Sequence, residues 1–117
     1  MSNYINEALS GFAKFDTYSI QPIGDVHILK PGLEEIQDYE TFAKSIGEED
    51  GVGILRTQVN YIGLNFIVDT KGKRIYNKKN IGPLVAAPVE ILVDIIAGFK
   101  ETFEKVSTKM EKLQKKR

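Results

Sequence analysis

The chain of 117 residues contains no cysteine, no tryptophan and a single histidine. The missing cysteines exclude thiol catalysis, disulfide bridges, iron–sulfur clusters and thiolate zinc sites. One histidine is too few for most other metal sites, so we expect no metal and no cofactor. No apolar run is long enough to cross a membrane as a helix, and the first residues lack the basic and apolar stretches of a secretory signal. These absences favour a cytoplasmic protein.

Charge is balanced over the whole chain but unevenly distributed along it. Sixteen basic residues are balanced by sixteen acidic ones, and the length and 42% apolar content are typical of a single domain, residues 1–117. Residues 105–117 contain six basic residues and one acid, residues 71–79 contain five basic residues and no acid, and residues 34–50 contain seven acids. Such clusters are typical of solvated helix faces, and they also suit docking to an acidic partner or an anionic lipid surface.

The sequence shows no catalytic motif. Gly51 and Gly53 form an isolated G-x-G pair without the rest of a phosphate-binding loop. His27 lies in an alternating strand pattern with no serine nucleophile beside it, so we expect it to pack rather than to catalyse. Because the chain has no net charge, it also lacks the basic excess that is typical of nucleic-acid-binding proteins. We therefore expect neither an enzyme nor a nucleic-acid-binding protein.

The apolar pattern predicts a mixture of helices and strands. Three segments have helical period, over residues 2–11, 33–46 and 99–113. Two short strands flank a turn that contains Pro22 and Gly24, and together they predict a hairpin. The strands are predicted over residues 18–21, 26–29, 52–59, 62–68 and 74–77.

Residues 84–96 fit both a helical stripe and a strand alternation. Pro88 would interrupt a helix that began at Leu84, and a run rich in valine and isoleucine favours the pleated form, so we expect one or two strands here. The short connections indicate a mainly antiparallel sheet, which the amphipathic helices must cover. The predicted fold class is therefore α+β, with a sheet of about six to seven strands.

Several short strings carry a family resemblance through their common order. Tyr4-Ile5-Asn6 is followed by Leu9, residues 25–32 read DVHILKPG, and residues 65–80 read NFIVDTKGKRIYNKKN. Residues 81–83 then precede two apolar segments and a closing amphipathic helix. In this order the strings resemble profilin, the small actin-monomer-binding protein, in its archaeal form. The resemblance implies a central antiparallel sheet with the N- and C-terminal helices on one face and a helix on the other, in a cytoplasmic, cytoskeleton-associated monomer.

The resemblance also implies an actin-binding face. In profilins this face is built from the central strands and from the start of the C-terminal helix. Arg74, Tyr76 and Lys78 share one face of their predicted strand by parity, as a docking surface requires. The positions that match the profilin face are Asn65, Arg74, Tyr76, Lys78, Lys79, Leu84, Phe99 and Lys100.

Two further profilin properties concern other ligands. Profilins bind polyproline between aromatic residues of their terminal helices. Tyr4 matches one such position, but His27 stands where the family has tryptophan and the last five residues contain no aromatic, so we expect weak or absent polyproline binding. Phosphoinositide binding would use the basic residues of 71–79 or of the C-terminal segment.

The expected function is therefore that of an actin-monomer-binding protein that regulates filament assembly. The alternative is a module of the roadblock or longin type, a dimeric platform for small GTPases with a similar order of elements. Residues 84–96 discriminate between the two interpretations: strands favour profilin, whereas a start of the last helix favours the platform.

Overall fold

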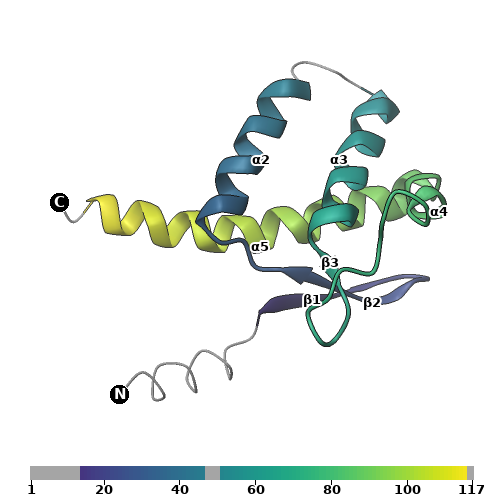
Figure 1. Cartoon of the computed structure of the whole chain (residues 1–117), viewed down its shortest axis with the longest axis horizontal. Helices are drawn as coiled ribbons and strands as arrows, with labels where there is room; N and C mark the ends of the chain where they lie inside the picture. Colours follow the sequence, from purple (N-terminus) through teal and green to yellow (C-terminus); the bar gives the residue numbers. More distant parts are fainter. Residues whose placement is uncertain (1–13, 47–50, 116–117) are drawn as a thin grey trace.

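The computed structural model of the chain describes residues 14–46 and 51–115, and the helix predicted over residues 2–11 lies outside them. The described elements combine helices with one small sheet (Figure 1). In chain order they are β1 (Phe15–Ile20), β2 (Gly24–Leu29), α2 (Leu33–Ile46), α3 (Gly51–Asn65), β3 (Ile67–Val68), α4 (Gly82–Val85) and α5 (Val89–Lys115).

The sheet has three antiparallel strands in the order β1-β2-β3. β1 and β2 form the predicted hairpin, and Gly24 closes its turn with a φ of 99°, a conformation that favours glycine. Tyr18 pairs with Val26 and Asp16 pairs with Ile28 in the hairpin register. Because side chains alternate along a strand, these four residues lie on one face of the sheet.

The expected sheet of six to seven strands is wrong, because most of the residues assigned to its central strands are helical. α3 occupies the segments predicted as strands over 52–59 and the first part of 62–68. Val59, Ile62 and Phe66 are all buried, and their spacing of three and four residues is that of a helix face. The alternation that begins at Ile62 therefore coexists with a helical stripe. Only Ile67–Val68 remain as a strand, and a single bridge joins Val68 to Arg74.

The strands expected over 84–96 are also wrong, because α4 and the start of α5 take their place. Pro88 directly precedes α5, and its carbonyl accepts hydrogen bonds from the N–H groups of Ile91 at 2.9 Å and Leu92 at 3.2 Å. A proline at this position removes no helical hydrogen bond, since the first N–H groups of a helix have no partner within it. Pro88 therefore does separate the helix that contains Leu84 from the residues after it, but those residues continue as the helix α5 and not as a strand.

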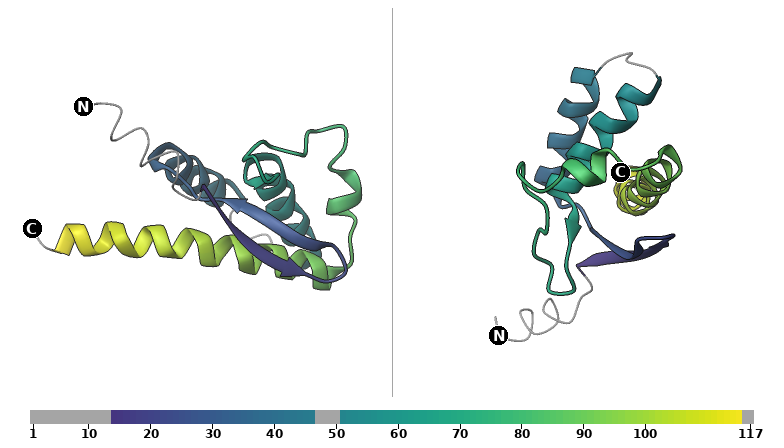
Figure 2. Two further views of the ribbon diagram at one scale, coloured as in Figure 1. Left: turned by 90° about the horizontal axis from the view of Figure 1, so that it is seen from below. Right: turned by 90° about the vertical axis from the view of Figure 1, so that its right-hand side faces the viewer.

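α5 lies between the hairpin and the α2–α3 pair (Figure 2). Gly98 sits where the helix crosses the sheet: a Cβ atom there would lie 3.1 Å from the ring of Tyr18 and 3.2 Å from Ile28 Cδ1. Because glycine has no side chain, this residue lets helix and sheet approach closely. The core consists mainly of aliphatic residues with two phenylalanines: Ile20, Val26, Ile28, Val59, Ile62, Phe66, Ile67, Ile81, Leu84, Ile91, Leu92, Ile95, Ile96 and Phe99.

α2 confirms the helix predicted over 33–46 and packs largely through aromatic rings. Its first turn is closed by Glu35, whose carboxylate accepts a hydrogen bond from the Gly32 N–H at 2.9 Å. The Tyr39 ring lies 5.1 Å from that of Phe99 on α5, measured between centroids. The Phe42 ring stacks on Tyr61 of α3 at 4.1 Å. These contacts fix α2 against both other long helices.

α5 is longer than the part of the described fold that packs against it. Its 27 residues span about 40 Å, and its C-terminal turns, yellow in Figure 1, extend beyond α2 and the sheet. The projecting part of α5 therefore presents side chains that the rest of the described fold covers only partly.

Within residues 14–46 and 51–115, no helix combines the length and the apolar character needed to cross a membrane.

Candidate functional site

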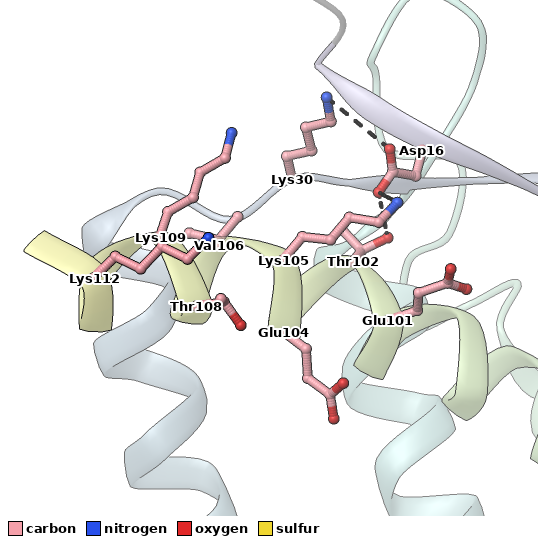
Figure 3. Close-up of a pocket in the computed structure, with 10 residues that line it drawn as sticks. All are labelled: Asp16, Lys30, Glu101, Thr102, Glu104, Lys105, Val106, Thr108, Lys109 and Lys112. Atoms are coloured by element: carbon pink, nitrogen blue, oxygen red, sulfur yellow. Dashed lines mark hydrogen bonds and ion pairs between the residues drawn. The ribbon is translucent and has the colours of Figure 1, made fainter.

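A groove of about 580 Å³ lies along the C-terminal half of α5, beside the start of β1 and the end of β2 (Figure 3). It forms because the helix continues past the short strands, so that residues 14–46 and 51–100 leave one face of its C-terminal half uncovered. Lysines are the most frequent residues of its lining. The groove is lined by Asp16, Lys30, Glu101, Thr102, Glu104, Lys105, Val106, Thr108, Lys109 and Lys112.

A chain of hydrogen bonds ties β1 to α5 at the inner end of the groove. Thr102 is only 1% exposed, and its hydroxyl donates to Asp16 Oδ2 at 2.9 Å, because a carboxylate accepts but does not donate. Thr102 Oγ1 therefore accepts the hydroxyl proton of Tyr18 at 2.6 Å. Burial raises the pKa of the Tyr18 phenol, so this donor stays protonated. The three side chains hold the wall of the groove in place.

Positive charge increases along the groove toward the C-terminus. Lys105 Nζ lies 3.5 Å from Asp16 Oδ2, and Lys30 Nζ lies 4.0 Å from Asp16 Oδ1. Lys109 and Lys112 follow Lys105 at four and three residues, which places all three on one side of the helix. No described acidic group forms an ion pair with Lys109 or Lys112. Their charge therefore stays available to a ligand.

An apolar stripe runs beside these lysines and continues out of the core. Phe99 is 1% exposed, Phe103, Val106 and Met110 are partly buried, and Leu113 is 64% exposed. The spacing of four, three, four and three residues keeps them on one face of α5. The face that holds the core together at Phe99 thus ends in solvent about four turns later, at Leu113.

The residues expected to bind actin do not form one strand face. Leu84 and Phe99 are buried in the core, whereas Lys100 is exposed on α5. Asn65 ends α3, and its carbonyl accepts a hydrogen bond from Arg74 Nε at 3.3 Å. The structure thus brings Asn65 and Arg74 together, beside the acidic first turns of α2.

Tyr76, Lys78 and Lys79 lie in an irregular segment in place of the predicted strand. Two asparagines shape it: Asn77 Oδ1 accepts the Lys79 N–H at 2.8 Å, and Asn80 Oδ1 accepts the Asn77 N–H at 2.6 Å. The Asx turn at Asn77 and the bond to Asn80 replace the ladder hydrogen bonds that a strand would need. Both lysines are exposed, while Tyr76 is partly buried and lines a separate apolar cleft of about 290 Å³.

The structure describes only one of the two positions considered for polyproline binding. His27 lies on β2, where its Nδ1 is 2.8 Å from Thr17 Oγ1 and its ring is 4.7 Å from that of Phe15. Tyr4 lies outside the described residues. His27 therefore packs within the hairpin, as the sequence predicts.

The acidic residues Glu34, Glu35 and Asp38 lie beside Tyr61 and Arg74. Burial raises the pKa of the Tyr61 phenol, and the nearby Asp38 carboxylate raises it further. Across the part of the chain that the structure describes, no three histidine or acidic side chains are placed to hold a metal ion. This cluster offers charge but no coordination site.

Comparison with known proteins places the chain in no family: no family model, no curated protein and no solved structure matches it. The groove therefore has to be interpreted from its own chemistry. The sequence had indicated its lysines through the basic segment 105–117, but not Asp16 or Thr102. The signal for Thr102 is its spacing from Ile95 and Phe99, which puts a polar residue on the buried face of α5.

Proposed function

We propose that this chain is a non-enzymatic protein-binding module that docks a partner protein on the C-terminal half of α5. The observation that carries the proposal is the apolar stripe, which leaves the core at Phe103 and reaches 64% exposure at Leu113. Apolar residues at helical spacing, flanked by charges, suit a partner that lays its own apolar face along the helix.

The proposal keeps the functional class expected from the sequence but moves the surface. The expected actin-binding residues were assigned to one face of a predicted strand, and the described residues form no such strand there. Binding to actin stays a prediction that co-sedimentation with monomeric and filamentous actin checks. Lys78→Glu with Lys79→Glu addresses the surface first expected, and variants of α5 address the surface proposed here.

Site-specific crosslinking in cells of the source organism tests the proposal. A photoreactive side chain replaces Met110 on the stripe and, in a matched control, Lys79 in the asparagine turn. We expect a discrete crosslinked partner from position 110 and none from position 79. The partner identified in this way is then purified and titrated against the chain by calorimetry.

Two leucines of equal exposure provide the matched variants for that titration. Leu113 ends the stripe, Leu33 begins α2, and each is 64% exposed. Leu113→Ser should weaken binding about three- to tenfold, because it removes one apolar anchor. Leu33→Ser should leave the affinity unchanged. Equal affinities of both variants and the parent chain would contradict the proposal.

A dimeric platform is the second candidate function. The continuous helix from Val89 is the observation that favours it over profilin, since residues 84–96 were the segment that distinguishes the two. The outer edge of β1 pairs with no strand among the described residues, and such an edge can pair with that of a second copy. Sedimentation equilibrium decides: a dimer supports the platform, whereas a monomer rules it out.

A further inference from the structure

We infer that the partner segment bound along α5 is an acidic amphipathic helix; this inference rests on the function proposed above. It assigns a chemistry to the ligand of the groove, which the apolar stripe alone does not. The assignment comes from charge complementarity at the projecting end of the helix.

The lysines that line the groove are placed to receive carboxylates in sequence. Lys105 already faces Asp16 at 3.5 Å, so part of its charge is neutralised within the chain. Lys109 and Lys112 lie one and two turns further out, without an ion pair to any described residue. A ligand that supplies two carboxylates at helical spacing would neutralise both without displacing the hydrogen bonds of Thr102.

The acidic residues of the groove lining are placed so that they do not repel the carboxylates of such a ligand. Glu101 and Glu104 lie at the inner half of the groove and precede Lys105 in the helix. In the view of Figure 3, Lys105 and Lys109 rise toward the strand, whereas Glu104 points to the other side of α5. Carboxylates of a ligand therefore meet attraction at the outer half, where the apolar stripe is also most exposed.

The apolar stripe favours a protein ligand over a small anion that would bind through charge alone. Phe103, Val106, Met110 and Leu113 cover about 15 Å of α5, which matches three turns of a partner helix. A soluble anion would use the lysines and leave these four side chains in water. A helix with leucines at one face and glutamates beside them satisfies both features at once.

A synthetic peptide is the direct probe. It has about 15 residues, is capped at both ends, carries leucine at positions i, i+3, i+4 and i+7, and has glutamates on the flanks of that face. The full chain is titrated into the labelled peptide, and fluorescence anisotropy gives the affinity. A second peptide with every glutamate replaced by lysine controls for apolar contact alone. We expect binding of the acidic peptide and at least about tenfold weaker binding of the lysine peptide.

Two double variants with the same charge change locate the site. Lys109→Glu with Lys112→Glu should weaken binding of the acidic peptide at least about tenfold. Lys78→Glu with Lys79→Glu, in the exposed asparagine turn, should change it less than about twofold. Circular dichroism checks that both variants keep the parent helix content. An equal loss in both would overturn the inference, because it would show attraction by overall charge rather than by the groove.

Three other outcomes also overturn it. The first outcome concerns vesicles that contain phosphatidylserine: retention on them that depends on Lys109 and Lys112, with no peptide binding, assigns the lysines to a lipid surface. Self-association that Lys109→Glu with Lys112→Glu abolishes makes a second copy the occupant. A crosslinked partner whose contact segment is neutral or basic removes the acidic chemistry but leaves the proposed function standing. Absence of any crosslink from position 110 would instead remove the proposed function.

Discussion

The hydroxyl of Thr102 on α5 donates a hydrogen bond to the carboxylate of Asp16 on β1 across a distance of 2.9 Å. The two residues are separated by 86 positions in the chain, so this bond joins the first strand to the last helix. The same contact sets the inner end of the groove, with Tyr18 donating to Thr102 from the side. The stability of the fold and the shape of the candidate site therefore share one polar cluster.

Replacing Thr102 by valine should destabilise the fold by about 1–3 kcal/mol, because the variant keeps the shape but leaves the Tyr18 hydroxyl without its acceptor and Asp16 without its donor. Urea unfolding followed by circular dichroism measures the change. Thr102→Ser keeps the hydroxyl and should lose less. Combining Thr102→Val with Tyr18→Phe should recover part of the loss, since both partners are then apolar. A Thr102→Val variant as stable as the parent would contradict the role of this cluster.

Two glycines in helices should respond to alanine in opposite directions. Gly98→Ala should destabilise the protein, because its Cβ would lie 3.1 Å from the Tyr18 ring and 3.2 Å from Ile28. Gly53→Ala in α3 meets no atom within 4 Å and should stabilise by about 0.5–1 kcal/mol. The midpoints of thermal unfolding of both variants give the comparison. Similar shifts of the same sign would show that α5 and the hairpin are not in close contact at Gly98.

Alkaline pH should weaken the aromatic packing of α2. Burial raises the pKa of Tyr39 above the ordinary value of 10.0, so the native state favours the neutral phenol. This contribution to stability is complete below about pH 10 and is lost as the pH rises through the higher pKa of the native state. Urea unfolding at about pH 8 and about pH 11 should show a smaller decrease for Tyr39→Phe than for the parent chain. An equal decrease in the free energy of unfolding of both proteins would show that ionisation of groups other than Tyr39 causes the loss of stability at alkaline pH.

The hairpin and α2 were predictable because their signals are local. Pro22 and Gly24 mark the turn, while Glu35 caps the helix that follows it. α3 was not predictable in the same way, because its apolar residues satisfy a strand period near Ile62 and a helical period from Val59 to Phe66. The outcome depended on tertiary contact: a Cβ at Gly63 would lie 2.8 Å from Ile81 Cδ1 and 3.1 Å from Leu84 Cδ2, so the glycine lets these two side chains pack closely on α3.

The candidate site shows the same division between local and distant information. The basic composition of the segment that contains Lys105, Lys109 and Lys112 can be recognised from the sequence alone. That this segment forms one wall of a groove depends on how α5 packs beside β1 and the end of β2. Asp16 enters the site through strand pairing and a contact across most of the chain, which no short window of sequence contains.

Replacing Asp16 by asparagine should separate stability from ligand binding. The amide oxygen can still accept the Thr102 hydroxyl, but Lys30 and Lys105 lose their opposite charge, so we expect a loss of about 1 kcal/mol in unfolding free energy. The groove meanwhile gains one unit of positive charge, and the acidic peptide should bind about two- to threefold more tightly at low salt. Asp25→Asn removes an exposed acid of the same hairpin outside the groove lining and serves as the matched control. Anisotropy titrations at low and high salt measure the effect, which should fade as salt screens it. Weaker peptide binding by Asp16→Asn would mean that Asp16 positions the lysines for the ligand instead of competing with it.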